Sequence, residues 1–283
     1  MDFGAFMFHT DYSMPIIELA QACEARGFES LWAPEHSHIP LSRKSPFPGG
    51  GDVPKMYYDA MDPFVILAAA AAATKTLKIG TGVCLVIQRD TIQTAKLAAS
   101  LDQVSGGRFL FGIGGGWNQD EMEDHGTVFA TRFKRMREQV EAMREIWTKS
   151  KPEYHGEIVD FPPMMAWPKP VQNPLPIIVG GAFPHAARRA VRYGNGWIPI
   201  AGRAIYGNFE DYFPQYKQML AEAGRTLDDA PITMFGAAPD YDQLMRYKEL
   251  GVARVVAGLP PEGAATVVPL LDKWAELIGR VNG

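Results

Sequence analysis

The chain has 283 residues, of which 47% are hydrophobic and 21% charged, and its formal net charge is −4. This is the composition of a globular domain with one substantial core, and the charge gives no electrostatic reason to expect nucleic acid. Two cysteines make no disulfide framework, the N-terminus shows no signal pattern, and the longest apolar run, residues 64–73, is too short to span a bilayer. We therefore expect a cytoplasmic protein, with neither nucleic acid nor a membrane as its partner.

Strand-like and helix-like segments alternate along the chain. Apolar runs typical of buried strands lie at residues 3–8, 28–33, 77–83, 108–113, 177–179, 197–200, 232–235 and 254–257. Helical spacing follows at residues 15–26, from 62, 91–104, 129–147, from 184, 209–223, 241–250 and 262–278. A short hairpin is predicted at residues 154–161, before the fifth strand.

Eight strand–helix units without a linker favour a closed (β/α)₈ TIM barrel, formed by a single domain over residues 1–283. An open Rossmann sheet would need Gly-x-Gly-x-x-Gly after the first strand. The only similar stretch, residues 112–117, follows the fourth strand and lacks the last glycine. The barrel is therefore the predicted fold.

In a barrel of this kind the chemistry lies at the C-terminal ends of the strands. The residues found there, in strand order, are His9 and Asp11; Glu35, His36, Ser37 and His38; Gln88 and Arg89; Gly114, Gly115, Gly116, Trp117, Asn118 and Asp120; Gly180, Gly181 and His185; and Arg203. Such a lining is glycine-rich, aromatic and mildly polar. It suits a flat heterocycle better than a highly charged sugar phosphate.

The glycines carry part of this prediction. Prolines at residues 168–176 should hold the chain extended before the fifth strand, which ends in Gly180 and Gly181 and is followed by a helix whose free N–H groups can bind an anion. Three adjacent glycines at 114–116 indicate close approach of a ligand to the backbone. Gly80 and Gly82, inside a predicted strand, indicate a bulge or a backbone contact.

Two interpretations of Glu35 and His36 remain open on spacing alone: an imidazole oriented by a carboxylate in a surface loop, or an acid–base pair. The His-x-His spacing of residues 36–38 also occurs in metal-dependent amidohydrolase barrels. Those place the motif after the first strand and an aspartate after the eighth, where this chain has Ala-Gly-Leu at 257–259. We therefore predict no metal. The basic run 132–137 is interpreted as a solvated helix face, and the loop 40–58 as a lid.

Five segments, taken in order, resemble the luciferase-like monooxygenase superfamily across nearly the whole chain. They are Leu-Trp-Ala-Pro-Glu-His at 31–36, Leu-Lys-Ile-Gly-Thr-Gly-Val at 77–83, the glycine-rich run at 105–117, the proline-rich run at 167–181 and Gly-Asn-Gly-Trp at 194–197. The compact length is more similar to the F420-dependent oxidoreductases, which use an 8-hydroxy-5-deazaflavin, than to the larger flavin monooxygenases of the superfamily.

The resemblance implies roles for individual residues. Glu35 takes the position of an acidic residue that contacts the deazaflavin, and His36 that of the catalytic acid/base. Gly82 and Val83 match a bulge, often a non-prolyl cis peptide, that supports the back face of the ring. The resemblance also implies cofactor contacts at Gly115, Gly116, Gly180, Gly181 and His185, the last three at the phosphate-bearing tail.

One departure bears on the substrate. Trp117 stands where the F420-dependent glucose-6-phosphate dehydrogenases carry a glutamate, and no cluster of Lys or Arg for a sugar phosphate is evident. We therefore expect F420-dependent hydride transfer to or from a neutral, rather apolar substrate. The alternatives are a reduced-FMN monooxygenase and a barrel that binds a flavin or deazaflavin without catalysis. A homodimer, common in the family, is expected through the helices near the second and third strands.

Overall fold

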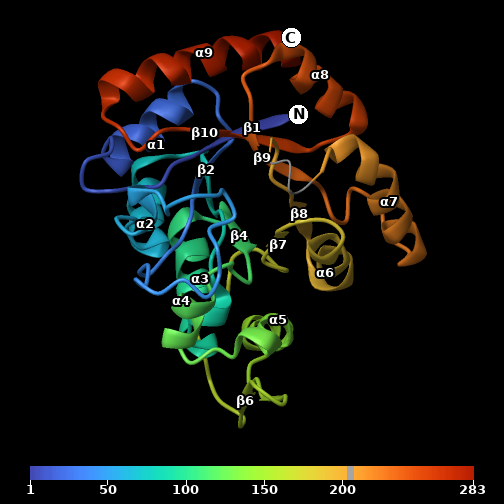
Figure 1. Cartoon of the computed structure of the whole chain (residues 1–283). Helices are drawn as coiled ribbons and strands as arrows, with labels where there is room; N and C mark the ends of the chain where they lie inside the picture. The colour runs from blue at the N-terminus through green and yellow to red at the C-terminus, as the bar shows by residue number, and fades with distance from the viewer. Residues whose placement is uncertain (203–206) are drawn as a thin grey trace.

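The computed structural model describes residues 1–202 and 207–283, and its centre is a barrel of eight parallel strands (Figure 1). The strands are β1 (Asp2–Phe6), β2 (Ser30–Ala33), β3 (Lys78–Thr81), β4 (Phe109–Ile113), β7 (Ile177–Gly180), β8 (Gly196–Ile198), β9 (Thr233–Ala237) and β10 (Arg254–Gly258). They lie in the order β8-β7-β4-β3-β2-β1-β10-β9, and isolated parallel bridges from Trp197 to Ile232 and from Ile200 to Phe235 join the two ends. The predicted (β/α)₈ barrel is confirmed.

Helices form the outer layer around the strands (Figure 1). They are α1 (Ile16–Ala25), α2 (Pro63–Ala73), α3 (Thr91–Ser105), α4 (Gln119–Asp124), α5 (Arg132–Thr148), α6 (His185–Tyr193), α7 (Phe209–Glu222), α8 (Tyr241–Leu250) and α9 (Ala264–Asn282), with 3₁₀ turns at Lys55–Tyr57, Val86–Gln88 and Phe129–Thr131. Local signals explain several boundaries. Asp62 caps α2 by accepting from two backbone N–H groups, with Pro63 in the first turn, and α3 ends at Gly106 in the left-handed conformation.

Several boundaries differ from the sequence prediction by two or more residues; the first strand, for example, ends at Phe6 rather than at residue 8. The third strand ends at Thr81 rather than at residue 83, because the chain turns at a cis bond between Gly82 and Val83. The long helix expected at 129–147 begins as a 3₁₀ turn and becomes α5 at Arg132. The short helix α4 was not predicted at all. The hairpin before the fifth strand is confirmed as β5 (Tyr154–His155) paired antiparallel with β6 (Asp160–Phe161).

The inside of the barrel is filled by side chains. Trp32 is fully buried there and packs with five others, namely Leu110, Ile178, Ile198, Phe235 and Val256. A Cβ on Gly80 would lie 2.4 Å from the indole of Trp32, which explains this glycine as a contact with a protein side chain. Because the interior is occupied, a ligand must bind at the mouth of the barrel. No helix in the described ranges 1–202 and 207–283 has the length and apolar character needed to cross a membrane.

Candidate active site

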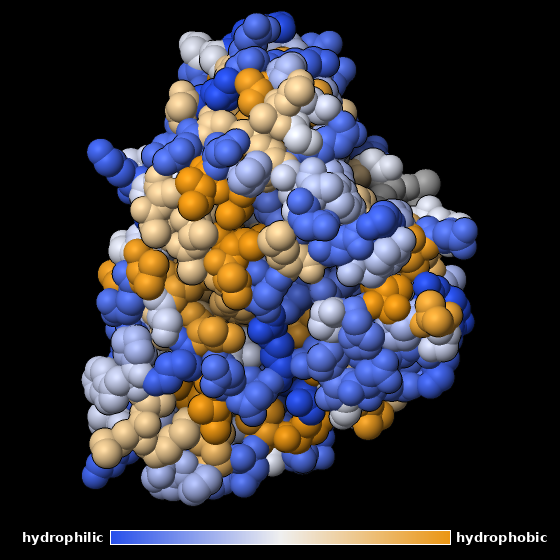
Figure 2. Space-filling model, turned by 90° about the vertical axis from the view of Figure 1, so that its left-hand side faces the viewer, coloured by the Kyte–Doolittle hydropathy of each residue, from blue (hydrophilic) through white to orange (hydrophobic). Residues whose placement is uncertain are grey.

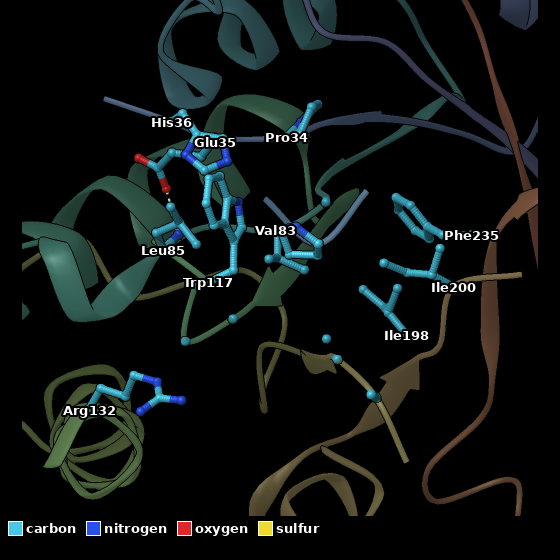
Figure 3. Close-up of a pocket in the computed structure, with 18 of the residues that line it drawn as sticks. Pro34, Glu35, His36, Val83, Leu85, Trp117, Arg132, Ile198, Ile200 and Phe235 are labelled. Carbon is cyan, nitrogen blue, oxygen red and sulfur yellow. Dashed lines mark hydrogen bonds between the residues drawn. The ribbon is translucent and has the colours of Figure 1, made fainter. Parts of the chain in front are cut away.

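A cavity of about 650 Å³ opens at the C-terminal ends of the strands (Figure 3). Its lining includes all the residues named above as catalytic or cofactor-binding: Glu35, His36, Gly82, Val83, Gly115, Gly116, Gly180, Gly181 and His185, together with Trp117. Gly114 also lines it, whereas eight other strand-end residues singled out in the sequence do not: His9, Asp11, Ser37, His38, Gln88, Arg89, Asn118 and Asp120. Arg203 lies outside the described residues. Position at a strand end therefore selects most of the polar and glycine lining of the cavity, together with several residues that lie outside the lining.

Val83 occupies the floor of the cavity. It follows the non-prolyl cis bond at the position that the family resemblance implied. A Cβ on Gly114 would lie 2.5 Å from one methyl group of Val83, and a Cβ on Gly180 would lie 2.7 Å from the other. A Cβ on Gly115 would likewise lie 2.6 Å from the ring of Phe133. These three glycines therefore make room for protein side chains, and their backbones also line the cavity, where the sequence predicts a ligand.

Glu35 lies at the edge of the cavity with both carboxylate oxygens bound to the protein. One oxygen accepts from the backbone N–H of Leu85 at 2.7 Å (Figure 3), and the other accepts from Arg89 Nε at 2.6 Å. Arg89 also contacts Asp62, at 2.6 Å between Nη2 and Oδ2. Only 7% of Glu35 is exposed. Its carboxylate thus anchors the segment after β3 that carries Val83.

His36 has a different carboxylate partner. Its Nδ1 lies 2.8 Å from Oε2 of Glu121 in α4, and the other Glu121 oxygen accepts from the backbone N–H of Ser37 at 3.2 Å. The side chains of His36 and Glu121 are only 7% and 1% exposed. With Nδ1 held by the carboxylate, Nε2 is the nitrogen left for the cavity. A histidine fixed in this way can give or take a proton at one defined atom.

Sequence reasoning missed Glu121. The only local signal is a helix start, because Asn118 caps α4 and accepts from the backbone N–H of Glu121 at 3.4 Å. An acidic residue three positions after a cap predicts that a helix begins there. It does not predict that the carboxylate reaches across to a histidine 85 residues earlier.

Aromatic rings from the loop after β2 close one side of the cavity over His36. The ring of Tyr57 lies 5.2 Å from the imidazole and 5.2 Å from Phe47, between centroids. Trp117 packs edge-to-face against both His36, at 6.0 Å, and Phe47, at 5.5 Å. Across the cavity from Trp117 lie the apolar side chains of Ile198, Ile200 and Phe235 (Figure 3). This end of the cavity therefore excludes water around the imidazole.

The same loop is tied to α4. Both oxygens of Asp120 accept from it, one from the Ser42 hydroxyl and one from the Lys44 backbone N–H, each at 2.8 Å. The Lys44 ammonium also contacts Glu123, at 2.6 Å. These bonds lower the pKa of Asp120 against the effect of desolvation. Helix α4 thus holds the loop through Asp120 and the imidazole through Glu121.

Two arginines mark the other end of the cavity. Arg132 and Arg189 both stack on the Phe133 ring, with guanidinium carbons 4.3 and 3.9 Å from its centroid. Within the described part of the chain neither forms an ion pair, and the Nε of each is buried without a hydrogen-bond partner. Burial lowers the pKa of both. They lie beside the first turn of α6, which begins at His185, so this end is built for an anion.

This position of Arg132 corrects an interpretation of the sequence. The basic run 132–137 had been assigned to a solvated helix face, whereas the guanidinium of Arg132 points from α5 toward the cavity (Figure 3). Residues 134 and 137 do follow the original interpretation: Lys134 pairs with Glu157, and Arg137 lies 3.9 Å from Glu141.

His36 and His38 point to different surroundings. His36 faces the cavity, whereas His38 is part of an exposed cluster in which Ser37 contacts both His38 and His125, and His38 contacts Asp124 at 3.0 Å. In the residues that the structure describes, no three His, Cys, Asp or Glu side chains converge in a way that could hold a metal ion. The His-x-His spacing therefore does not create a shared site.

Comparison with known proteins gives several relatives. An uncharacterized protein of Mycobacterium tuberculosis is 37% identical over 97% of this chain and 98% of its own. The F420-dependent glucose-6-phosphate dehydrogenase of Amycolatopsis mediterranei is 26% identical over 77% of this chain and 63% of its own. Among solved structures, the monooxygenase RslO1 from Streptomyces bottropensis superposes with a TM-score of 0.79 at 19% identity, over 100% of both chains.

A second solved structure is the coenzyme F420-dependent tetrahydromethanopterin reductase of Methanopyrus kandleri, with a TM-score of 0.73 at 18% identity over 99% of both chains. At these identities the two structures establish the fold alone. The family itself is given by a sequence model described as luciferase-like monooxygenase, which matches residues 3–238. The chain belongs to the luciferase-like monooxygenase family.

Proposed function

We propose that this protein is an oxidoreductase that binds the deazaflavin F420 across the barrel mouth and transfers a hydride between it and a small, neutral, largely apolar substrate. The observation that carries the proposal is the polarity of one cavity. A histidine held by a carboxylate lies under aromatic rings at one end, and two arginines without carboxylate partners lie at the other. The relationship to F420-dependent enzymes supports the choice of cofactor.

The residues present fit such a cofactor. The orphaned guanidinium nitrogens of Arg132 and Arg189, with the first turn of α6 at His185, would hold the phosphate-bearing tail. Val83 would lie against the ring. Glu35 would act indirectly, because its bonds to Leu85 and Arg89 hold the segment that presents Val83.

The proton is handled by the protein. When bound, a deazaflavin supplies two-electron hydride chemistry and lacks the N5 that flavin oxygen chemistry requires. His36 gives a proton to the substrate oxygen, or takes one from it, at Nε2. Glu121 stabilises the positive charge of the protonated imidazole, which exists before His36 gives the proton or after it takes one. Tyr57, Phe47 and Trp117 exclude water from the reacting atoms.

A reduced-FMN monooxygenase is the second candidate, and the superposition on a monooxygenase favours it. Fluorescence titration of the purified protein with F420 and with FMN, each oxidised and reduced, separates the two. Saturable binding of F420 with little of FMN supports hydride transfer. Preferential binding of reduced FMN moves the assignment to oxygenation, and F420 binding without turnover on any reductant or substrate leaves a binding protein.

Substitution of the two arginines tests where the phosphate-bearing tail of F420 binds. Replacing Arg132 and Arg189 together by Met should weaken F420 binding by about 10- to 100-fold, as expected for loss of charge-assisted hydrogen bonds. Binding of the deazaflavin that lacks the phosphate tail should be unchanged. Arg188→Met, on the same helix but outside the lining, is the matched control. Equal weakening of both ligands would contradict the assignment.

We further propose a homodimer formed through α1 and α2. Val65 of α2 is 70% exposed and Ile17 of α1 is 46% exposed, although both are large apolar residues on neighbouring helices. Figure 2 views this side and shows apolar surface gathered on it. Val65→Asp should convert the protein to a monomer in sedimentation velocity, whereas Val128→Asp, at an exposed valine outside these helices, should not.

A further inference from the structure

One buried donor at the aromatic end of the cavity has no partner. In the described residues the indole Nε1 of Trp117 is buried and makes no hydrogen bond. An indole N–H can only donate, so burying it without an acceptor is unfavourable. Figure 3 shows this nitrogen on the side of the ring turned toward Val83, at the cavity floor.

The other buried tryptophans of the barrel show how unusual this is. Three of them donate at ordinary distances: Trp32 to Ser30 Oγ at 2.9 Å, Trp147 to the Ala95 carbonyl at 3.0 Å and Trp197 to the Gly181 carbonyl at 2.9 Å. For these three indoles the fold supplies the acceptor. Trp117 lines the cavity, and the residues that the structure describes provide no acceptor for its indole N–H.

The surroundings define the acceptor that would fit. The imidazole of His36 lies 6.0 Å from the indole between centroids, so both groups face the same part of the cavity. Phe8, Phe47 and Tyr57 complete an apolar enclosure around it. The nearby cation Arg89 is already paired with Glu35, and Glu121 stands behind His36, so nothing here favours an anion.

We infer that Trp117 is a specificity-determining residue whose indole N–H, together with His36 Nε2, binds a single neutral oxygen of the substrate. The substrate class is then a ketone or aldehyde, or the corresponding alcohol, whose remaining surface is apolar. The inference rests on the proposed function for its chemistry. In the reductive direction the carbonyl carbon gains the hydride, the π electrons of C=O move to oxygen, and oxygen gains the proton of His36 while it accepts from Trp117.

The test uses two molecules of similar shape, cyclohexanone and methylenecyclohexane, which differ by an oxygen acceptor. The full-length protein without cofactor is titrated while the Trp117 indole N–H is followed by ¹H–¹⁵N NMR, its resonance being assigned by its loss in Trp117→Phe. The ketone should move this resonance downfield in a saturable manner, and the alkene should not. No movement up to the solubility limit of the ketone, or equal movement with both probes, would overturn the inference.

The affinities of variants for the two probes test the inference independently. Trp117→Phe should bind cyclohexanone about tenfold more weakly and bind methylenecyclohexane as the native protein does. Phe47→Leu changes the same aromatic enclosure without removing a donor, so it should weaken both probes alike. Retention of the ketone preference in Trp117→Phe would contradict the role of the indole. Because no cofactor is present, failure of the F420 proposal would leave these results unaffected, and failure here would leave F420 binding unaffected.

Discussion

The segments after β3 and β4 each deliver one charged side chain to the loop that follows β2. Arg89, from the first, pairs with Glu35, and Glu121, from the second, pairs with His36. In the first pair both carboxylate oxygens are bound within the protein, and the guanidinium has a second partner in Asp62. In the second pair the carboxylate is equally occupied, but the imidazole retains one nitrogen for the cavity.

This difference distinguishes a pair that holds the backbone in place from a pair that can transfer a proton. Two neighbours in sequence, Glu35 and His36, lie along the same cavity, yet only one of them has an atom free to react. A paired group that is satisfied at every atom holds backbone in place. A paired group with one free atom becomes a directed acid or base. The following variants break each pair in turn.

His36→Asn should have the largest effect. Loss of the acid/base group should lower kcat by about 10²- to 10⁴-fold, while F420 affinity stays nearly the same. Single-turnover kinetics and the F420 fluorescence titration measure the two quantities separately. His38→Asn, in the exposed cluster next along the chain, should behave as the native enzyme. If affinity and turnover fell together, His36 would be a binding residue.

Glu35→Gln should act on stability. Breaking the pair with Arg89 should lower the free energy of unfolding by about 3 kcal/mol, the lower end for a buried ion pair, because Asp62 still contacts the guanidinium. Urea denaturation measures it. Glu123→Gln removes a partner of the exposed Lys44 and should leave the free energy of unfolding nearly unchanged. An undiminished stability of Glu35→Gln would mean that the first pair does not support the segment.

His9 provides a contrast with His36, which has a carboxylate partner. The Nε2 of His9 is buried and has no hydrogen-bond partner among the described residues. Burial lowers the pKa of His9 to about 4 from the ordinary value of 6.5. The unfolded chain therefore takes up the proton first, so the stability is full above pH 6.5 and falls as the pH drops toward 4, by about 3 kcal/mol. His9→Leu should flatten this part of the stability–pH profile. A profile unchanged by His9→Leu would argue against this origin.

Glu121→Gln should give the smallest change. The amide fills the same space and keeps one of the two contacts, to His36 or to the Ser37 N–H, but carries no charge. We expect kcat to fall about 10- to 100-fold, the usual effect of removing a carboxylate behind a functional histidine, with KM and the melting temperature little changed. A change in KM alone would show that Glu121 shapes the pocket and does not assist the proton.

Much of this molecule follows from local pattern. Alternating apolar and helical segments gave the barrel, and strand-end position gave most of the cavity lining, because a closed parallel sheet brings all its C-terminal strand ends together. Helix α4 was missed because six residues are too few for a periodic signal.

The two site residues that the sequence does not predict were missed for the same reason. Arg132 and Glu121 belong to helices whose orientation on the barrel decides what their side chains meet, and composition does not encode that orientation. The glycines at 114, 115 and 180 show the converse. Their need for space was visible in the sequence, but the occupants, Val83 and Phe133, come from other strands and helices.

The shared tether of α4 has a consequence for selectivity. Asp120 holds the loop and Glu121, the next residue, holds the imidazole, so ordering the loop and ordering the proton donor are one event. We therefore expect a substrate that contacts Phe47 and Tyr57 poorly to show a lower kcat as well as a weaker affinity, because a loop held less firmly through Asp120 also leaves the His36 imidazole held less firmly.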